Sequence, residues 1–207
     1  MLTVVTPAND YHLLTVDERR RAARVIGGSA DIALEAMSLQ ASAIIASLCK
    51  MPRAGVSVPT LLRETFSETI RPVHFQEHLI LGRRFVTSVA SVTVNGIALV
   101  VADYEIASSE GVLYRLSGNE RRGWDCTKTV VQFVAGFVDI PYDLKMAAAK
   151  LVSGAYTAMV QDPALKREYV IGVGEYEYFG GLRGEAAIPP EVKHVLMPYI
   201  YRAQGRT

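Results

Sequence analysis

The chain has 207 residues, half of them hydrophobic, and its 22 basic and 21 acidic residues leave a formal net charge of +1. This length suffices to bury a substantial core in one domain or two small ones. A net charge so close to zero argues against a protein that binds nucleic acid, or an acidic partner, through its overall charge.

Two cysteines and short apolar runs indicate the compartment. Cys49 and Cys126 are far apart and have no metal-ligand spacing, so we expect buried free thiols in a reducing compartment. The longest apolar runs, near residues 41–48 and 97–102, are shorter than a bilayer requires, and the first residues do not read as a secretion signal. The sequence therefore predicts a protein that is made in the cytoplasm and does not bind a membrane.

Residues 1–59 are predicted to form a short arm and a pair of helices. Thr15 and Glu18 have the T-x-x-E spacing of a capping box, which places the start of the first helix at residue 16. The second helix is expected over residues 30–51, because Pro52 would stop it there.

Residues 60–137 have the patterns of a β-rich insert. Residues 87–94 alternate small polar and apolar side chains with the period of a strand. Asn95 and Gly96 follow directly, and this dipeptide between two β-rich runs is a strong hairpin signal. The strands are expected at 64–71, 86–95, 97–106, 112–116 and 128–135.

Residues 138–161 are predicted to form the main helix of a bundle. Pro141 suits a first helical position, and Asp143 places a carboxylate in the first turn. Apolar residues then recur at helical spacing along one stripe: Leu144, Ala148, Leu151, Val152, Ala155 and Met159.

Residues 162–207 are predicted to form an extended arm that ends in a short helix, which begins at Pro189–Pro190. The whole chain is thus expected to be one structural domain of the α+β class, mainly α, in which a helical bundle carries the β-rich insert.

One motif has the composition of a metal site. His74, Glu77 and His78 match the H-x-x-E-H pattern of some zinc peptidases, which require both histidines on one helix face. Here the motif lies in the β-rich region, so we interpret it as a chance match and keep a metal-dependent hydrolase only as a rival hypothesis. We therefore expect a protein that is not an enzyme, with no catalytic residues, cofactor or metal.

The aromatic residues after the main helix are interpreted as a contact surface. Aromatic side chains are enriched in protein interfaces, and the glutamates among them would repel phosphate. The candidates for contact with a second subunit or a partner are Tyr169, Tyr176, Tyr178 and Phe179.

Several segments occur in an order that resembles a known family. They are Leu14–Glu18, Val86–Val94, Val131–Phe137, Ile140–Lys145, Leu151–Tyr156 and Val195–Tyr199. This order resembles the head–tail connector proteins (adaptor or head-completion proteins) of tailed bacteriophages, which are also found in prophages and gene-transfer particles. The resemblance covers residues 14–201, and the arginine-rich first helix departs from it.

The resemblance implies a structural role in a virion, at the junction of head and tail. Such adaptors are monomers until they dock on the portal protein, where about twelve copies form a ring. DNA passes through this ring without sequence-specific binding, and a stopper or tail-completion protein binds the far side. Another virion or tail-completion component with the same fold is the alternative.

In that family the C-terminal segment commonly reaches onto the portal. The matching stretch here is residues 188–207. The residues that the resemblance places at the portal contact are Val195, Leu196, Tyr199, Tyr201 and Arg202.

Overall fold

A computed structural model describes residues 1–201 except 56, 161–166, 171–173 and 178–187. The chain divides into two compact units. The β unit contains Met1–Tyr11, Cys49–Asp139 and the residues from Ile200 on. The helical unit contains His12–Leu48 and Ile140–Tyr199.

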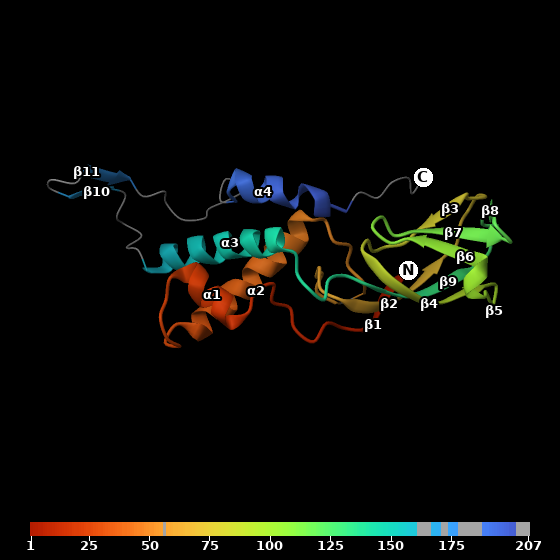
Figure 1. Ribbon diagram of the computed structural model, residues 1–207, viewed down its shortest axis with the longest axis horizontal. Helices are drawn as coiled ribbons and strands as arrows, with labels where there is room; N and C mark the ends of the chain where they lie inside the picture. Colours follow the sequence, from red (N-terminus) through yellow and green to blue (C-terminus); the bar gives the residue numbers. More distant parts are fainter. Residues whose placement is uncertain (56, 161–166, 171–173, 178–187, 202–207) are drawn as a thin grey trace. The chain divides into compact units, whose positions relative to one another are not determined.

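The larger sheet of the β unit has five antiparallel strands in the order β1-β2-β9-β4-β5 (Figure 1). Its strands are β1 (Leu2–Thr6), β2 (Glu64–Ile70), β4 (Val86–Val94), β5 (Ile97–Ala98) and β9 (Thr129–Ala135). The central strand β9 buries every second residue, as expected for a strand with one face on a core. Asn95 and Gly96 join β4 to β5 with φ angles of +50° and +85°, which confirms the predicted hairpin.

A second antiparallel sheet has the order β3-β7-β6, and β8 pairs with β7. Its strands are β3 (His78–Ile80), β6 (Tyr104–Ala107), β7 (Val112–Ser117) and β8 (Glu120–Arg122), with a 3₁₀ turn, η1 (Val101–Asp103), before β6. Phe66 and Phe133 from the first sheet and Leu113 from the second belong to one buried cluster. Trp124 joins this cluster, and its indole N–H donates to the Leu113 carbonyl at 3.2 Å.

The described residues of the helical unit form four helices, and Figure 1 shows α3 running beside α1 and α2. They are α1 (Val16–Ala23), α2 (Asp31–Leu48), α3 (Tyr142–Val160) and α4 (Pro190–Leu196), followed by a 3₁₀ turn, η3 (Met197–Tyr199). The capping box is confirmed: Thr15 and Glu18 each accept the other's backbone N–H through their side chains. Arg24 ends α1 in the left-handed conformation.

The long helix α3 buries the stripe that the sequence predicts over most of its length. Leu144, Leu151 and Val152 are buried, whereas Met159 in the last turn is 54% exposed. Lys145 connects α3 to α1 through an ion pair with Glu18 at 2.8 Å. Burial alone would raise the pKa of the Glu18 carboxyl, but hydrogen bonds from Lys145 and Thr15 outweigh it and lower that pKa.

The helix α2 is long and apolar enough to cross a membrane when judged by length and composition alone. Core helices of proteins outside membranes meet the same criterion, and one face of α2 packs on α1 and α3. After α3, the strands β10 (Arg167–Val170) and β11 (Gly174–Glu177) form an antiparallel pair.

The expectation of a mainly α protein is wrong. Helix accounts for about 34% of the residues and strand for about 29%, so the fold is α+β with substantial sheet. The reason is that residues 60–137 fold into two sheets that share a core of their own, and the N-terminal arm adds the strand β1 to one of them. The expectation of two buried thiols is also wrong in part, because Cys49 is buried but Cys126 is exposed.

Candidate interaction surfaces

The C-terminal helix α4 is anchored in the helical unit by apolar and polar contacts. Val192 and Leu196 are each 1% exposed. Glu191 forms an ion pair with Lys150 of α3, and the Lys150 ammonium lowers the pKa of the Glu191 carboxyl. These contacts fix the face of α4 that the unit covers.

The turn after α4 makes a second polar anchor on α3. The hydroxyl of Tyr199 donates to the Asp143 carboxylate, at 2.7 and 2.8 Å from its two oxygens. Asp143 also accepts the backbone N–H of Leu144 at 2.8 Å, at the start of α3. The Asp143 carboxylate thus links the start of α3 to the segment after α4.

The next two residues, Ile200 and Tyr201, form hydrogen bonds within the β unit. The Tyr201 backbone N–H donates to the Cys49 carbonyl at 2.7 Å, and its hydroxyl donates to the Leu81 carbonyl at 3.2 Å. The Arg84 guanidinium donates to the Ile200 carbonyl at 3.0 Å. Residues 200–201 are therefore held by Cys49, Leu81 and Arg84, which all belong to the β unit.

The structure accordingly divides the predicted portal contacts between the two units. Val195, Leu196 and Tyr199 belong to the helical unit, whereas Tyr201 belongs to the β unit. Val195 and Tyr199 are half-buried, and Leu196 is fully buried. Arg202 lies outside the described residues.

The predicted aromatic contact surface falls partly on the pair of strands after α3. Tyr169 lies in β10 opposite Glu175, and Tyr176 lies in β11 opposite Glu168. Among the described strands, these two pair only with one another. The other two candidates, Tyr178 and Phe179, lie outside the described residues.

The H-x-x-E-H motif does not lie on a helix. His74 is exposed in the segment before β3, and His78 is the first residue of that strand. Within the described ranges, no three His, Cys, Asp or Glu residues are grouped so that they could hold a metal ion. The segment therefore lacks the helical geometry that zinc peptidase chemistry needs.

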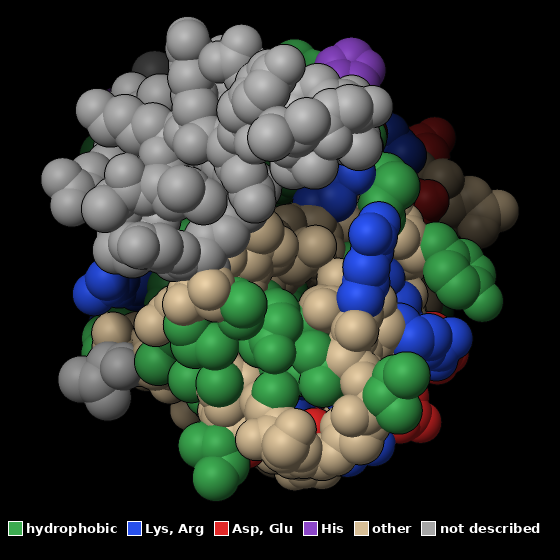
Figure 2. All heavy atoms as spheres, turned by 90° about the vertical axis from the view of Figure 1, so that its left-hand side faces the viewer, with side chains coloured by type: hydrophobic (Ala, Val, Ile, Leu, Met, Phe, Trp, Pro, Cys, Tyr) green, Lys and Arg blue, Asp and Glu red, His purple; other side chains and the backbone are tan. Residues whose placement is uncertain are grey.

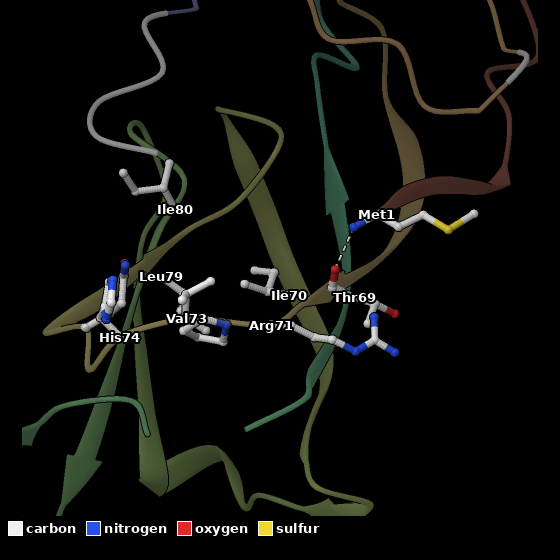
Figure 3. A pocket seen from close by; sticks show the side chains of 10 residues that line it. Met1, Thr69, Ile70, Arg71, Val73, His74, Leu79 and Ile80 are labelled. Atoms are coloured by element: carbon white, nitrogen blue, oxygen red, sulfur yellow. Dashed lines mark hydrogen bonds between the residues drawn. The ribbon is translucent and has the colours of Figure 1, made fainter. Parts of the chain in front are cut away.

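A cavity of about 330 Å³ lies in the β unit, at the end of β2 and beside β3 (Figure 3). The Met1 amine borders it and donates to the Thr69 carbonyl at 2.6 Å. Its lining is mostly apolar, with Arg71 and His74 as the basic residues, and contains no carboxylate, thiol or serine. The cavity has the composition of an apolar contact site rather than of a catalytic one. The full lining is Met1, Thr69, Ile70, Arg71, Pro72, Val73, His74, Gln76, Leu79 and Ile80.

A buried ion pair inside the β unit was missed by the sequence analysis, and no residue pattern marks it. Arg83 and Glu64 are 4% and 2% exposed, and their charged groups are 3.3 Å apart. Arg83 also donates to the Thr60 carbonyl at 2.9 Å and lies over the ring of Phe66. Burial raises the pKa of Glu64 and lowers that of Arg83, and each charge partly offsets the effect on the other.

This pair connects segments that are distant in the sequence. Glu64 accepts the backbone N–H of Ala8 at 3.4 Å, which links β2 to the N-terminal arm. Four residues further along β2, the buried carboxylate of Glu68 accepts the Gly82 N–H at 2.6 Å. These carboxylates are bound within the unit, so we assign them a structural role.

No protein-family model matches the sequence, and a comparison with curated proteins also finds no match. Solved structures do match. A chain in the neck of an empty gene transfer agent (GTA) particle, computed with C6 symmetry, has a TM-score of 0.61 and 20% identity, with all of both chains covered. A chain in the neck of a native GTA particle, computed with C12 symmetry, has a TM-score of 0.57 and 18% identity, again over all of both chains.

A third match is a chain in the virion of a native GTA particle, with a TM-score of 0.55 and 20% identity. It covers 84% of this chain and 90% of the other. At these identities the matches establish a shared fold. The protein therefore has the fold of chains found in the necks of phage-like particles.

Proposed function

We propose that this protein is a structural component of the neck of a phage-like particle and has no enzymatic role. The observation that carries the proposal is the shared fold with GTA neck chains along the full length of both chains. The order of sequence segments supports the same role independently, because it resembles the head–tail connectors of tailed phages.

The finer proposal is an adaptor that forms a ring under the portal and joins the capsid to the tail. The GTA necks were computed with sixfold and twelvefold symmetry, which is the kind of assembly that a ring of identical chains provides. A net charge of +1 suits a ring through which DNA must slide, since strong phosphate binding would hold the DNA in place.

The proposed portal contact is the C-terminal segment, with Val195, Leu196, Tyr199, Tyr201 and Arg202. In the structure the described part of this segment is held by its own chain. Leu196 is 1% exposed, and the Tyr199 hydroxyl is bound to Asp143. Contact through these two side chains requires α4 and the turn after it to leave α3, so portal binding has to offset the contacts that are lost.

The test is a binding measurement with the portal protein encoded near this chain. We expect light scattering to find a monomer for the chain alone and a complex with several copies of the chain per portal ring after mixing. The Val195→Asp variant should lose this binding, because it places a charge on the half-buried side of α4. His194→Asp is the matched control, because it changes an exposed position of the same helix.

Circular dichroism of both variants checks that α4 and the rest of the chain remain folded. A wild-type chain that binds a tail tube and not the portal would identify it as a tail-completion component instead. A wild-type chain that binds neither would contradict a place in the neck. Equal portal binding by the two variants would contradict the assigned contact and leave the adaptor role intact.

A further inference from the structure

The helix α2 is more apolar than its burial within the chain explains. It is apolar enough to meet the criterion for a membrane span, yet only 28% of its residues are buried within the described part of the chain. Asp31 and Glu35 are its only charged residues, and it has no lysine or arginine. The exposed side of α2 carries the polar Glu35, Gln40 and Ser47, but it also carries apolar residues, which a surface helix normally places on its covered face. The outer face of α2 is therefore a surface that another protein segment is expected to cover.

The exposed apolar residues of α2 form one stripe. It consists of Ile32, Ala36, Leu39 and Ala43, whose spacing of four, three and four residues puts them on the same side of a helix. All four are exposed, with Ile32 at 87% and Leu39 at 42%. We call this the α2 stripe.

The helix α3 has a similar stripe on the side that faces away from the core of the unit. It consists of Tyr142, Met146, Ala149 and Ser153, with the same spacing of four, three and four residues. Tyr142 is 89% exposed and Met146 is 46% exposed, whereas Ala149 and Ser153 are half-buried. None of the four is charged. We call this the α3 stripe.

We propose that the α2 stripe of one copy packs against the α3 stripe of the next copy, so that these helices form the lateral contact of the ring. This inference rests on the proposed function, because the ring supplies the second copy. In a cyclic ring of more than two copies, each subunit has two different lateral faces that must fit one another. A single chain that exposes two different uncharged helical stripes meets this requirement.

The side chains of the two stripes are complementary in size. The alanines of the α2 stripe leave room for the large Tyr142 and Met146 side chains of the α3 stripe, which allows close approach of the two helices. The charged residues beside the stripes have partners within the chain: Lys150 is paired with Glu191, and Glu35 lies 3.9 Å from His12. We therefore assign the contact to apolar packing rather than to ion pairs between copies.

The surface view agrees with an uncovered apolar area on the helical unit. Figure 2 shows hydrophobic side chains gathered at the surface, with Lys and Arg side chains beside them. Ile32 at the start of α2 and Val160 at the end of α3 are 87% and 66% exposed. Figure 1 shows these two ends of the antiparallel helices at the same end of the unit.

A lipid bilayer is the competing occupant of the α2 stripe, because α2 has the length and hydropathy of a membrane span. The opposite face of α2 argues against it. Leu34, Ala41 and Ile45 are at most 2% exposed and belong to the core of the helical unit. Insertion into a membrane would pull these residues out of that core, whereas packing on a second copy leaves them in place.

The experiment is site-directed cross-linking of the full chain in a Cys126→Ser background, because Cys126 is exposed and Cys49 is buried. One protein carries Ala43→Cys on α2, and a second carries Ser153→Cys on α3. The proteins are concentrated, mixed with the portal protein and treated with a flexible bis-maleimide. We expect a covalent dimer only when both proteins are present, and a ladder of oligomers from a chain that carries both cysteines.

Asn119→Cys, at the exposed turn between β7 and β8, is the matched control and should give no ladder with either partner. Light scattering of the same samples measures ring formation separately. Rings that form without an α2–α3 cross-link would overturn this inference and leave the proposed function standing. Samples in which the parent chain forms no ring would contradict the proposed function itself, together with this inference.

Two further outcomes contradict the α2–α3 contact. Covalent dimers from the Ala43→Cys protein alone would show that α2 packs on α2. Flotation of the chain with vesicles of phosphatidylcholine and phosphatidylglycerol, abolished by Leu39→Glu, would assign the α2 stripe to a membrane. A soluble chain that stays below the vesicles and gives the ladder supports the inference.

Discussion

The buried ion pair of the β unit makes a quantitative prediction about pH and stability. In an Arg83→Met variant, the methionine replaces the guanidinium with an apolar side chain of similar reach. The carboxyl of Glu64, whose side chain is fully buried, then loses its opposite charge. Removal of one partner of a buried pair typically costs about 3–5 kcal/mol, because the other charge is left without compensation.

Protonation of the Glu64 carboxyl limits this loss of stability and makes it depend on pH. A buried carboxyl can avoid the penalty by taking up a proton, and its ordinary pKa is 4.5. At pH 7 that protonation costs about 1.4 kcal/mol for each of about 2.5 pH units, or about 3.4 kcal/mol. At pH 5 the same cost falls to about 0.7 kcal/mol. The variant should therefore regain about 2.7 kcal/mol of stability between pH 7 and pH 5.

The sign follows from proton binding. In the variant the folded state holds a proton on Glu64 that the unfolded state releases above its ordinary pKa, so stability falls as pH rises. Burial also raises the pKa of Glu64 in the wild-type chain, but Arg83 partly offsets the effect. The stability of the wild type should also fall as pH rises, over a narrower range of pH that starts at the ordinary carboxyl pKa.

Urea unfolding followed by tryptophan fluorescence measures this dependence for the β unit. The chain has one tryptophan, and Trp124 is buried in the core of that unit. The double variant Arg83→Met with Glu64→Gln is the control, because it cannot take up the proton and should lose the added pH dependence. If the single variant keeps the wild-type slope between pH 5 and pH 7, the reasoning about the buried charge is wrong.

Three other changes test the packing of each unit. Leu151→Asp should unfold the helical unit, since it puts a charge on the buried face of α3. Thr157→Asp, on the exposed face, should lower the stability by at most about 1 kcal/mol. Thermal unfolding followed by circular dichroism compares the two variants. Gly136→Ala should destabilise the β unit by at least about 1–3 kcal/mol in urea unfolding, because φ is +101° and a Cβ would lie 2.2 Å from a backbone oxygen. Burial raises the pKa of Cys49 to about 12, so iodoacetamide at pH 8 should modify Cys126 first. Mass spectrometry measures the two modification rates, and equal rates would refute the burial of Cys49.

Local signals in the sequence predicted local structure well. The capping box needs only Thr15 and Glu18, which are three residues apart, and it is present as predicted. The Asn95–Gly96 turn needs only a backbone with positive φ at two adjacent residues, and it forms the expected hairpin. Both features are decided by sterics and hydrogen bonds within a few residues.

These local signals did not predict which strands, distant in the sequence, pair with one another. The strand β1 pairs with β2, so that Leu2 lies opposite Glu68, and no pattern in either segment specifies that partner. For the same reason the balance of helix and sheet was misjudged, since strands that are short in sequence add up to two sheets with a shared core. The ion pair of Arg83 and Glu64 was missed because a charged residue in a β-rich run reads as an exposed one until its partner is known.

For the hydrophobic residues of α2, the structure shows which are buried within the chain and which face outward, and the sequence does not. The sequence has apolar residues on every side of this helix, so its pattern does not distinguish a core position from an outward one. The structure separates them, because Leu34 and Ile45 are buried within the chain while Ile32 remains 87% exposed. Since the inner residues already form the core of the helical unit, the outer residues do not add to the stability of the single chain. Their hydrophobic free energy becomes available only when another surface covers them, which is the property expected of a contact that forms during assembly.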